Sequence, residues 1–531
     1  MQPDSIPVWR REEIVLSARG QYDNPLQDAQ LQVTFTSPSG KTHTMDGFWD
    51  GGQTWRARFM PDEAGKWTWE TKCSNPNDVG LHRQRGEFTC ISARNETRFD
   101  RHGAIRVSSN QRYLQHADGT PFFWLSDTVW NGPLLSTQEE WDLYVQTRAA
   151  QKFTAAQWVT TEWIASPQGN REGRLAFTGH DRIAIDPTFF QRLDEKVDAL
   201  NAAGILSAPV LLWAARWMRQ YSDNAINPGL SLPESQAILL ARYMVARWGA
   251  HHVLWILNGD GHYAESAERW RIIGRGVFGN REHAPVTLHP GGWRWDHPYF
   301  ADEMWLDIWG YQSAHKLDEE SLRFLTDGPA AHEWNKPPIH PIINLEPPYE
   351  DHNDMSSEGK RRIDAHAVRR ALYTSLLITP TAGVSYGGHG VWGWDKGDAL
   401  PTAHPLTGVA KRWQDALQLP VAREMPHLFD FFNSLEWWRL RPATEMVRVQ
   451  PGDKQPSRAI IAARTDAGDL ALVYTPEEQN LQLNLSGLRE KVKPRWFHAA
   501  TGEYHAARCV GTWNAARFET PSADDWVLVL Q

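Results

Sequence analysis

The chain has 531 residues, a length that favours about two to four domains over a single core. Its hydrophobic and charged fractions, 41% and 22%, are those of an ordinary globular protein. The formal net charge of −9 argues against a nucleic-acid partner, and no apolar stretch of about 18 residues offers a membrane span.

The first residues, MQPDSIPVWRREEIVL, contain no apolar core of a secretory signal, so a cytoplasmic location is favoured. A periplasmic or secreted location stays open if a leader has been removed. The three cysteines, Cys73, Cys90 and Cys509, are too few for a disulfide framework. We expect Cys73 and Cys90 to be buried free thiols, with a pair between neighbouring strands as the alternative. The sequence does not fix the oligomeric state.

Residues 1–97 are predicted to form an N-terminal β-sandwich. Short β-rich runs such as LQVTFTSPSG and GKWTWETKCS are separated by turn signals such as SNPND. About seven strands over this length are typical of a sandwich. No catalytic constellation is recognisable in them.

Between residues 98 and 430, strand-like runs alternate with helical ones. The strand candidates cover residues 121–130, 153–163, 205–217, 252–260, 284–292, 304–312, 340–348 and 382–394. Helices are predicted over 136–151, 186–204, 233–251, 266–279, 319–328, 359–378 and 405–418, and 292–304 has room for about one helical turn. Eight such repeats predict a (β/α)8 TIM barrel. A doubly wound sheet is the alternative, but no GxGxxG or GxxxxGKS/T loop follows any strand.

Residues 431–531 return to β-type runs such as AIIAARTDAGDLALVYTP and DDWVLVLQ, joined by DAGD and ATGE turns. They predict a small C-terminal β-sandwich. The expected fold class is therefore α/β, a TIM barrel flanked by two β-sandwiches.

Two apolar runs end abruptly on a carboxylate, VLWILNGD at Asp260 and HPIINLEPPYE at Glu346. In a barrel, the C-terminal ends of all strands share the face where chemistry occurs, and the fourth and seventh strands lie across it from one another. A retaining glycosidase needs an acid to protonate the leaving oxygen and an ionised carboxylate, about 5–5.5 Å away, to attack the sugar. We predict Asp260 as the acid/base and Glu346 as the nucleophile. For each, the alternative is a helix cap or a partner for an arginine.

The other strand tips carry the amides, imidazoles and flat aromatic rings that bind sugars, in a chain with 28 tryptophans. The predicted substrate-binding residues are Asp127, Trp130, Gln157, Glu162, Trp163, Trp213, Asn258, His289, Tyr311, Gln312, Tyr349, Tyr386, His389, Trp392 and Trp394.

Several of these have a structural alternative. Asp127 could cap a helix or pair with a buried arginine. Glu162 could instead be the acid/base if the strand assignment is shifted by one repeat. His289 and His389 could be structural histidines, and the tryptophans of the third and eighth strands could plug the barrel mouth.

No metal and no cofactor are predicted. There is no HExxH or CxxC pattern for a metal and no GxSxG elbow for a serine hydrolase. The glycines of SYGGHG (385–390) are expected to allow tight turns or close backbone approach to substrate rather than to cradle phosphate.

The order of FFWLSDTVW, WILNGD, NLEPPYE and YGGHGVWGWD resembles the apiosidase-like glycoside hydrolases, over nearly the whole chain. The resemblance implies a barrel between a leading β-sandwich and a trailing β-domain. It matches Asp260 to the acid/base, Glu346 to the nucleophile, and Asp127 and Gln157 to substrate contacts. The second-strand segment WVTTEW departs from the Asn-rich form expected of the family. A glycoside is therefore implied, such as a furanoside of a plant, algal or bacterial polysaccharide, but not apiose itself.

The functional hypothesis is a retaining glycoside hydrolase with a carbohydrate substrate. One alternative is a non-catalytic carbohydrate-binding protein on a barrel scaffold. The other is a polysaccharide lyase, for which Tyr311 and His389 are the candidate bases.

Overall fold

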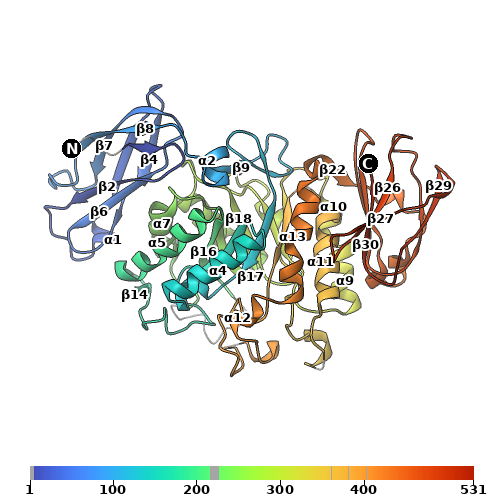
Figure 1. Ribbon diagram of the computed structural model, residues 1–531. Helices are drawn as coiled ribbons and strands as arrows, with labels where there is room; N and C mark the ends of the chain where they lie inside the picture. Colours follow the sequence, from blue (N-terminus) through green and yellow to red (C-terminus); the bar gives the residue numbers. More distant parts are fainter. Residues whose placement is uncertain (1–4, 216–225, 360, 381, 402–403) are drawn as a thin grey trace.

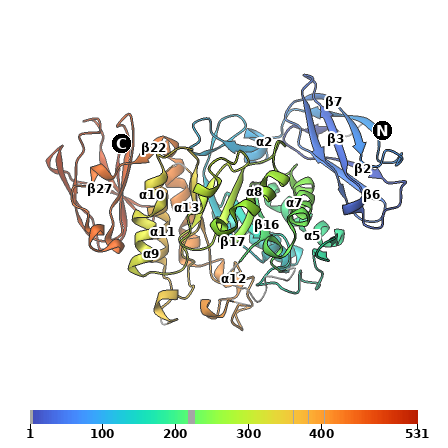
Figure 2. The same cartoon turned by 180° about the vertical axis from the view of Figure 1, so that it is seen from behind.

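The computed structural model describes residues 5–215, 226–359, 361–380, 382–401 and 404–531. A β-sandwich (blue), a barrel and a second β-domain (red) lie in a row, with the barrel in the middle (Figure 1, Figure 2). The expected α/β fold class, a TIM barrel between β-rich domains, is confirmed. Residues 216, 217 and 360, at or near the ends of two predicted elements, lie outside the described residues.

The N-terminal domain is a sandwich of two sheets. One sheet has the order β1 (Ile6–Pro7), β8 (Arg85–Ile91), β7 (Gly65–Cys73), β3 (Leu31–Thr36) and β4 (Thr42–Asp46), and the other β2 (Glu12–Ser17), β6 (Thr54–Phe59) and β5 (Phe48–Trp49). Alternate residues such as Val33, Ala57 and Trp67 form the core between the sheets. Cys73 and Cys90 are buried free thiols, because the register pairs Cys90 with Gly65 at the opposite end of β7.

Eight parallel strands form the barrel. In sheet order they are β18 (Val286–Pro290), β17 (Trp255–Gly261), β16 (Leu206–Trp213), β13 (Ala155–Val159), β12 (Trp124–Thr128), β21 (Gly383–Tyr386), β20 (Ile342–Glu346) and β19 (Trp309–Gln312). A parallel bridge from Thr287 to Ile308 joins β18 to the chain entering β19 and closes the ring. Nearly every strand residue is buried, because helices cover the outside while side chains fill the inside.

Helices surround this ring. They are α3 (Gly132–Leu135), α4 (Gln138–Ala150), α5 (Pro187–Ala202), α6 (Pro228–Ser231), α7 (Glu234–Trp248), α8 (Ala267–Val277), α9 (Glu319–Asp327), α10 (Pro329–Glu333), α11 (Ala365–Ile378), α12 (Trp413–Ala416) and α13 (Pro420–Asn433). The predicted capping box is present at the start of α4, where Thr137 and Glu140 each accept the other's backbone N–H. Residues 292–304 hold one 3-10 turn, η3 (His297–Phe300), as the sequence predicted.

The helix predicted over 405–418 is wrong. The structure has a 3-10 turn at Pro405–Thr407, the four-residue α12, and then α13, which follows the eighth strand as its helix. Gly408, at a φ of 84°, ends the first turn, and Pro420 starts α13. The apolar spacing that suggested one helix comes instead from loop residues that pack separately.

Short elements complete the first two domains. They are α1 (Pro25–Asp28), α2 (Arg98–His102), the three-stranded sheet of β9 (Ile105–Val107), β10 (Leu114–His116) and β11 (Pro121–Phe122), and the hairpin of β14 (Phe177–Thr178) and β15 (Ala184–Ile185).

The C-terminal domain packs a larger sheet on a smaller one. The larger sheet has the order β22 (Leu440–Pro442), β23 (Ile461–Thr465), β24 (Ala471–Thr475), β30 (Trp526–Leu530), β26 (Pro494–His498) and β27 (Tyr504–Ala506), and the smaller β25 (Asn480–Leu483), β29 (Ala515–Glu519) and β28 (Val510–Thr512). Both sheets contribute to one core, for example through Val473, Leu481 and Phe518.

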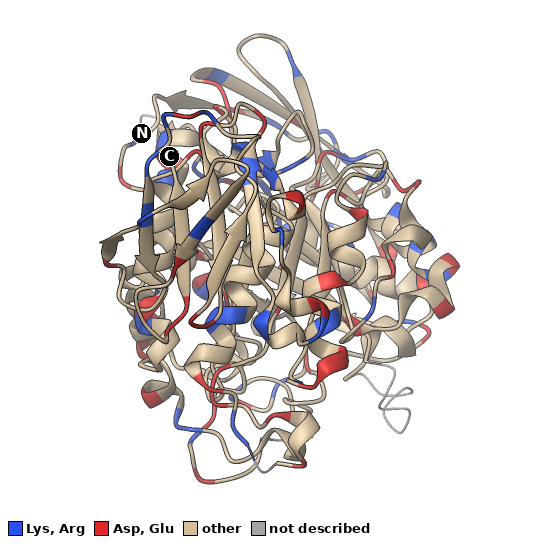
Figure 3. Cartoon of the chain, turned by 90° about the vertical axis from the view of Figure 1, so that its right-hand side faces the viewer, with Lys and Arg blue, Asp and Glu red and all other residues tan. Residues whose placement is uncertain are grey.

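Buried ion pairs join both terminal domains to the barrel. At the N-terminal side, Asp194 of α5 accepts from Arg58 of β6 and from Arg247 of α7, each at 2.7 Å, and Arg247 also contacts Asp50 at 2.8 Å. At the C-terminal side, Arg369 of α11 contacts Asp525 at 2.8 Å. On the face shown in Figure 3, basic and acidic residues are interspersed. None of the helices in the described residues is long and apolar enough to cross a membrane.

Candidate active site

The two predicted catalytic carboxylates lie at the same mouth of the barrel. Asp260 stands next to the end of β17, at a φ of 56°, and Glu346 is the last residue of β20. Gln312, the last residue of β19, lies between them. Its Nε2 is 3.4 Å from Asp260 Oδ1, and its backbone pairs with Glu346.

Glu346 is buried and held by two hydrogen-bond donors, with 10% of its side chain exposed. His315 Nε2 lies 3.0 Å from Oε1, and the Tyr349 hydroxyl donates to Oε2 at 2.6 Å. His289 Nε2 is 3.6 Å from Oε2. Burial raises the pKa of this carboxyl, but the hydrogen bond from His315 and the neighbouring donors outweigh burial and hold the pKa below its ordinary value. Glu346 is therefore ionised near neutral pH.

Aromatic rings at or just beyond the ends of β12, β13 and β16 wall the mouth. Trp213 makes edge contacts with Trp163, at a centroid distance of 4.4 Å, and with Trp130, at 6.0 Å. Trp130 also contacts His289 at 5.3 Å. Trp213 lies flat over Gly259, where any Cβ would overlap its ring. The glycine before Asp260 thus makes room for an indole beside the candidate acid.

Several predicted substrate-binding residues carry buried polar atoms without a hydrogen bond in the described part of the chain, and three of them are central to the proposed site. The atoms of these three are both amide atoms of Asn258, both ring nitrogens of His289 and the indole Nε1 of Trp213. Buried polar groups are usually paired, so such atoms at one barrel mouth are candidates to bind hydroxyl groups.

Two further predicted residues, Gln157 and His389, make hydrogen bonds within the protein. Gln157 Nε2 donates to Thr128 Oγ1 and to the carbonyl of Leu345, both at 2.7 Å, and so braces the strand that carries Glu346. His389 contacts the carbonyl of Gly408 at 2.9 Å and accepts from Trp392 Nε1 at 3.2 Å.

Asp127 does not join this group. It is fully buried on the helix side of β12, where Arg148 Nε donates to it at 2.7 Å and the Tyr144 hydroxyl at 3.0 Å. Asp127 is thus the partner of a buried arginine, which was the structural alternative. The expected contact of Asp127 with a sugar is wrong. Tyr386 points to the same layer and donates to Glu350 at 2.8 Å.

Tyr311, Trp394 and Glu162 also turn away from the mouth. Tyr311 contacts Phe324 of α9, and Trp394 stacks on Trp413 at 4.1 Å. Glu162 is buried and accepts from the backbone N–H of Ala176 at 2.8 Å, and burial raises its pKa to about 7. Tyr311 turns away because successive strand residues face opposite sides, whereas Glu162 and Trp394 lie in the loops after β13 and β21.

Sequence reasoning missed His315 and His352. His315 follows β19 by three residues and contacts Glu346, and the His352 ring lies 4.3 Å from that of His315. Both stand in loops without periodicity. The available signal was a histidine just beyond a strand tip, in YQSAH.

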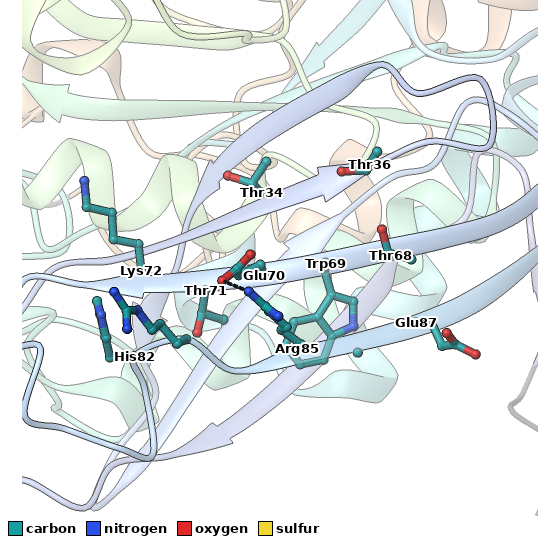
Figure 4. Close-up of a pocket in the computed structure, with 12 residues that line it drawn as sticks. Thr34, Thr36, Thr68, Trp69, Glu70, Thr71, Lys72, His82, Arg85 and Glu87 are labelled. Atoms are coloured by element: carbon teal, nitrogen blue, oxygen red, sulfur yellow. Dashed lines mark hydrogen bonds and ion pairs between the residues drawn. The ribbon is translucent and has the colours of Figure 1, made fainter.

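A hollow away from the barrel mouth lies on the sheet formed by β3, β7 and β8 (Figure 4). It measures about 820 Å³ and is lined by threonines and by charged residues such as Glu70 and Arg85, which pair at 2.9 Å. Trp69, which is partly buried and lies against Gly86, also lines the hollow.

Comparison with known proteins gives the family. Residues 108–439 match the model of the apiosidase-like catalytic domain, more than half of the chain, and the protein belongs to this family. Residues 5–74 match a domain of unknown function, DUF5060, and residues 442–531 match a model named for a collagen-binding domain of a collagenase.

Solved structures share the fold. A Bacteroides vulgatus protein described as a glycoside hydrolase superposes with a TM-score of 0.73 at 17% identity, covering 99% of both chains. A family 5 glycoside hydrolase from the same organism gives 0.69 at 22% identity, covering 82% of this chain and 95% of that one. At these identities the likeness shows the fold alone. No curated protein matches the chain.

Proposed function

We propose that the protein is a glycoside hydrolase that cleaves O-glycosidic bonds of a polysaccharide or oligosaccharide by a retaining double displacement. The observation that carries this proposal is the buried, ionised carboxylate of Glu346, held by two donors at a barrel mouth that also presents Asp260. Membership of the apiosidase-like family supports the reaction class.

In the first displacement, an oxygen of Glu346 attacks the anomeric carbon while Asp260 gives its proton to the leaving oxygen. The glycosidic C–O bond breaks and a glycosyl ester forms. In the second, Asp260 takes a proton from water, whose oxygen attacks the anomeric carbon and releases Glu346. The different exposures of the two acids suit these roles. Buried Glu346 is shielded from solvent, whereas Asp260 is partly exposed where water must enter.

The carbohydrate would be bound by the unpaired polar atoms of Asn258, His289 and Trp213, with the aromatic wall against its C–H faces. The lyase alternative is less well supported, because Tyr311, one of its two candidate bases, packs against α9. The binding-protein alternative does not require an ionised Glu346 beside an acid.

The test is the pair Asp260→Asn and Glu346→Gln. We expect each to lower kcat at least about a thousandfold with the thermal midpoint unchanged, since a nucleophile or an acid/base is removed while its shape is kept. Glu265→Gln, which changes an exposed carboxylate near Asp260, should keep wild-type turnover and serves as the control. Substantial activity in either active-site variant would refute the assignment, and a product of inverted anomeric configuration would refute the retaining mechanism.

A further inference from the structure

The hydrogen bonds of His315 indicate which of its ring nitrogens carries the proton. Its Nδ1 accepts the backbone N–H of Tyr349 at 3.2 Å, and its Nε2 lies 3.0 Å from Glu346 Oε1. A backbone N–H can only donate, so Nδ1 must offer a lone pair. The proton therefore resides on Nε2 and is donated to the carboxylate. The two contacts together favour one tautomer of the ring.

Two aromatic rings pack against His315. The rings of Tyr349 and His352 both lie 4.3 Å from it, and burial lowers the pKa of His352 well below its ordinary value. His352 itself donates from Nδ1 to the carbonyl of Asn353 at 2.6 Å. The groups that face Glu346 are His315, His289, the Tyr349 hydroxyl and, beyond Gln312, Asp260. No lysine or arginine of the described residues forms an ion pair with Glu346.

A neutral N–H donor affects the carboxylate of Glu346 differently from a cationic partner. A guanidinium or an ammonium would bind the carboxylate strongly and lower its tendency to attack carbon. A neutral N–H donor orients the carboxylate and favours its ionised form, but leaves its negative charge uncompensated. Burial without any donor would instead favour the protonated, unreactive acid.

We propose that His315 is a positioning residue, a neutral imidazole whose tautomer is fixed by the Tyr349 amide and which keeps Glu346 ionised and in one orientation for attack. The inference deepens the proposed function and rests on it, because it takes Glu346 as the nucleophile.

Two variants separate the two contacts of the ring. The amide of His315→Gln reaches the place of Nε2 and can still donate to Glu346. The shorter amide of His315→Asn reaches only the place of Nδ1, so it keeps the contact with Tyr349 and loses that with Glu346. His297→Gln is the control, since His297 is a buried histidine that contacts the carbonyl of Gly310 instead of a carboxylate.

In the asparagine variant we expect the acid limb of kcat/KM to move up by about one pH unit and kcat to fall about 10- to 100-fold, with KM within about threefold of wild type. The glutamine variant should keep the wild-type limb and most of kcat. A wild-type pH profile in the asparagine variant, or equal losses in both variants, would overturn the proposal.

A second measurement does not depend on activity. Thermal midpoints from pH 7 to pH 3 should show that His315→Asn destabilises most at pH 7 and least at pH 3, because a carboxylate with a lowered pKa stabilises the fold only while it is ionised. In a Glu346→Gln background this pH dependence should vanish. If it persists there, His315 does not act through Glu346. If it vanishes as expected but no glycosidase activity is found, the positioning contact stands and the proposed reaction fails.

Discussion

The role of a carboxylate at the end of a barrel strand depends on the side of the strand from which its side chain projects. Glu346 projects to the mouth, where N–H and O–H donors keep it ionised and open to attack. Asp127 projects to the helix layer, where Arg148 occupies it. Its pKa is raised, since the effect of complete burial exceeds that of the arginine. Two carboxylates at the same level of the barrel thus differ in role: one belongs to the candidate active site and the other to the packing of the helix layer.

Removing Arg148 should therefore be costly. Arg148→Met leaves a buried carboxyl without its charged partner, and we expect a loss of about 3–5 kcal/mol in the free energy of unfolding, measured by urea denaturation. The exposed pair of Arg85 and Glu70 gives the matched control, and Arg85→Met should change stability little. Equal losses in the two variants would contradict the importance of burial at Asp127.

The positions of Glu346 and Asp260 could be predicted from the sequence because a buried parallel strand is an apolar run, and its end is marked by the first charge. The side to which a residue points could not be predicted as well, since a shift of one residue in the strand boundary reverses it. This is why Asp127 and Tyr386 were expected at the mouth. His315 was not found because its role depends on the fold of a loop.

At the scale of elements, glycines at the strand tips make room for aromatic side chains. Gly259 at the end of β17 lies under Trp213, and Gly387, just after β21, lies against the ring of Tyr349. In both places an added Cβ would overlap the ring. The glycines of SYGGHG were expected to permit turns or a close approach of substrate, and at Gly387 the close neighbour is a protein side chain.

Gly387→Ala should displace Tyr349 and weaken its hydrogen bond to Glu346. We expect kcat to fall about tenfold and the acid limb of the pH profile to rise, because one of the two donors that lower the pKa of Glu346 is disturbed. The measurement is kcat/KM against pH. Gly291→Ala is the control, because a Cβ there makes only ordinary contacts of 3.5–3.6 Å. An unchanged profile in Gly387→Ala would show that Tyr349 does not tune Glu346.

Most strands and helices of the barrel could be predicted because their burial imposes a period that the sequence displays. The region after the eighth strand could not. Its apolar residues, including Trp413, serve contacts such as the stack with Trp394, which follow no helical period.

At the scale of the whole molecule, buried ion pairs join the N-terminal sandwich to the barrel. Asp194 bridges Arg58 of the sandwich and Arg247 of the barrel, all largely buried. Burial acts to raise the pKa of Asp194, but the two arginines outweigh it and lower that pKa far below its ordinary value. Its contribution to stability is therefore complete above about pH 4–5 and is lost only as pH falls through the folded-state pKa.

Asp194→Asn should lower the thermal midpoint by several degrees at pH 7, since two buried arginines each lose one of their charged partners and keep only Glu13 or Asp50. The difference from wild type should stay constant down to about pH 5 and shrink below about pH 4. Glu87→Gln, in the exposed pair with Lys66, should have little effect at any pH. A difference that does not change in acid would mean that the loss comes from packing rather than from charge.

The connection between β18 and β19 has a consequence for engineering. It contains one 3-10 turn instead of a helix, and the ring closes there through the bridge of Thr287 to Ile308 and the amides of Asp307 and Ile308, which donate to the carbonyl of Val286. New chain termini placed in this connection would fall between two barrel strands without cutting a helix of the barrel. Splitting the chain there would give one segment that carries β12 to β18 and a second that carries β19 to β21.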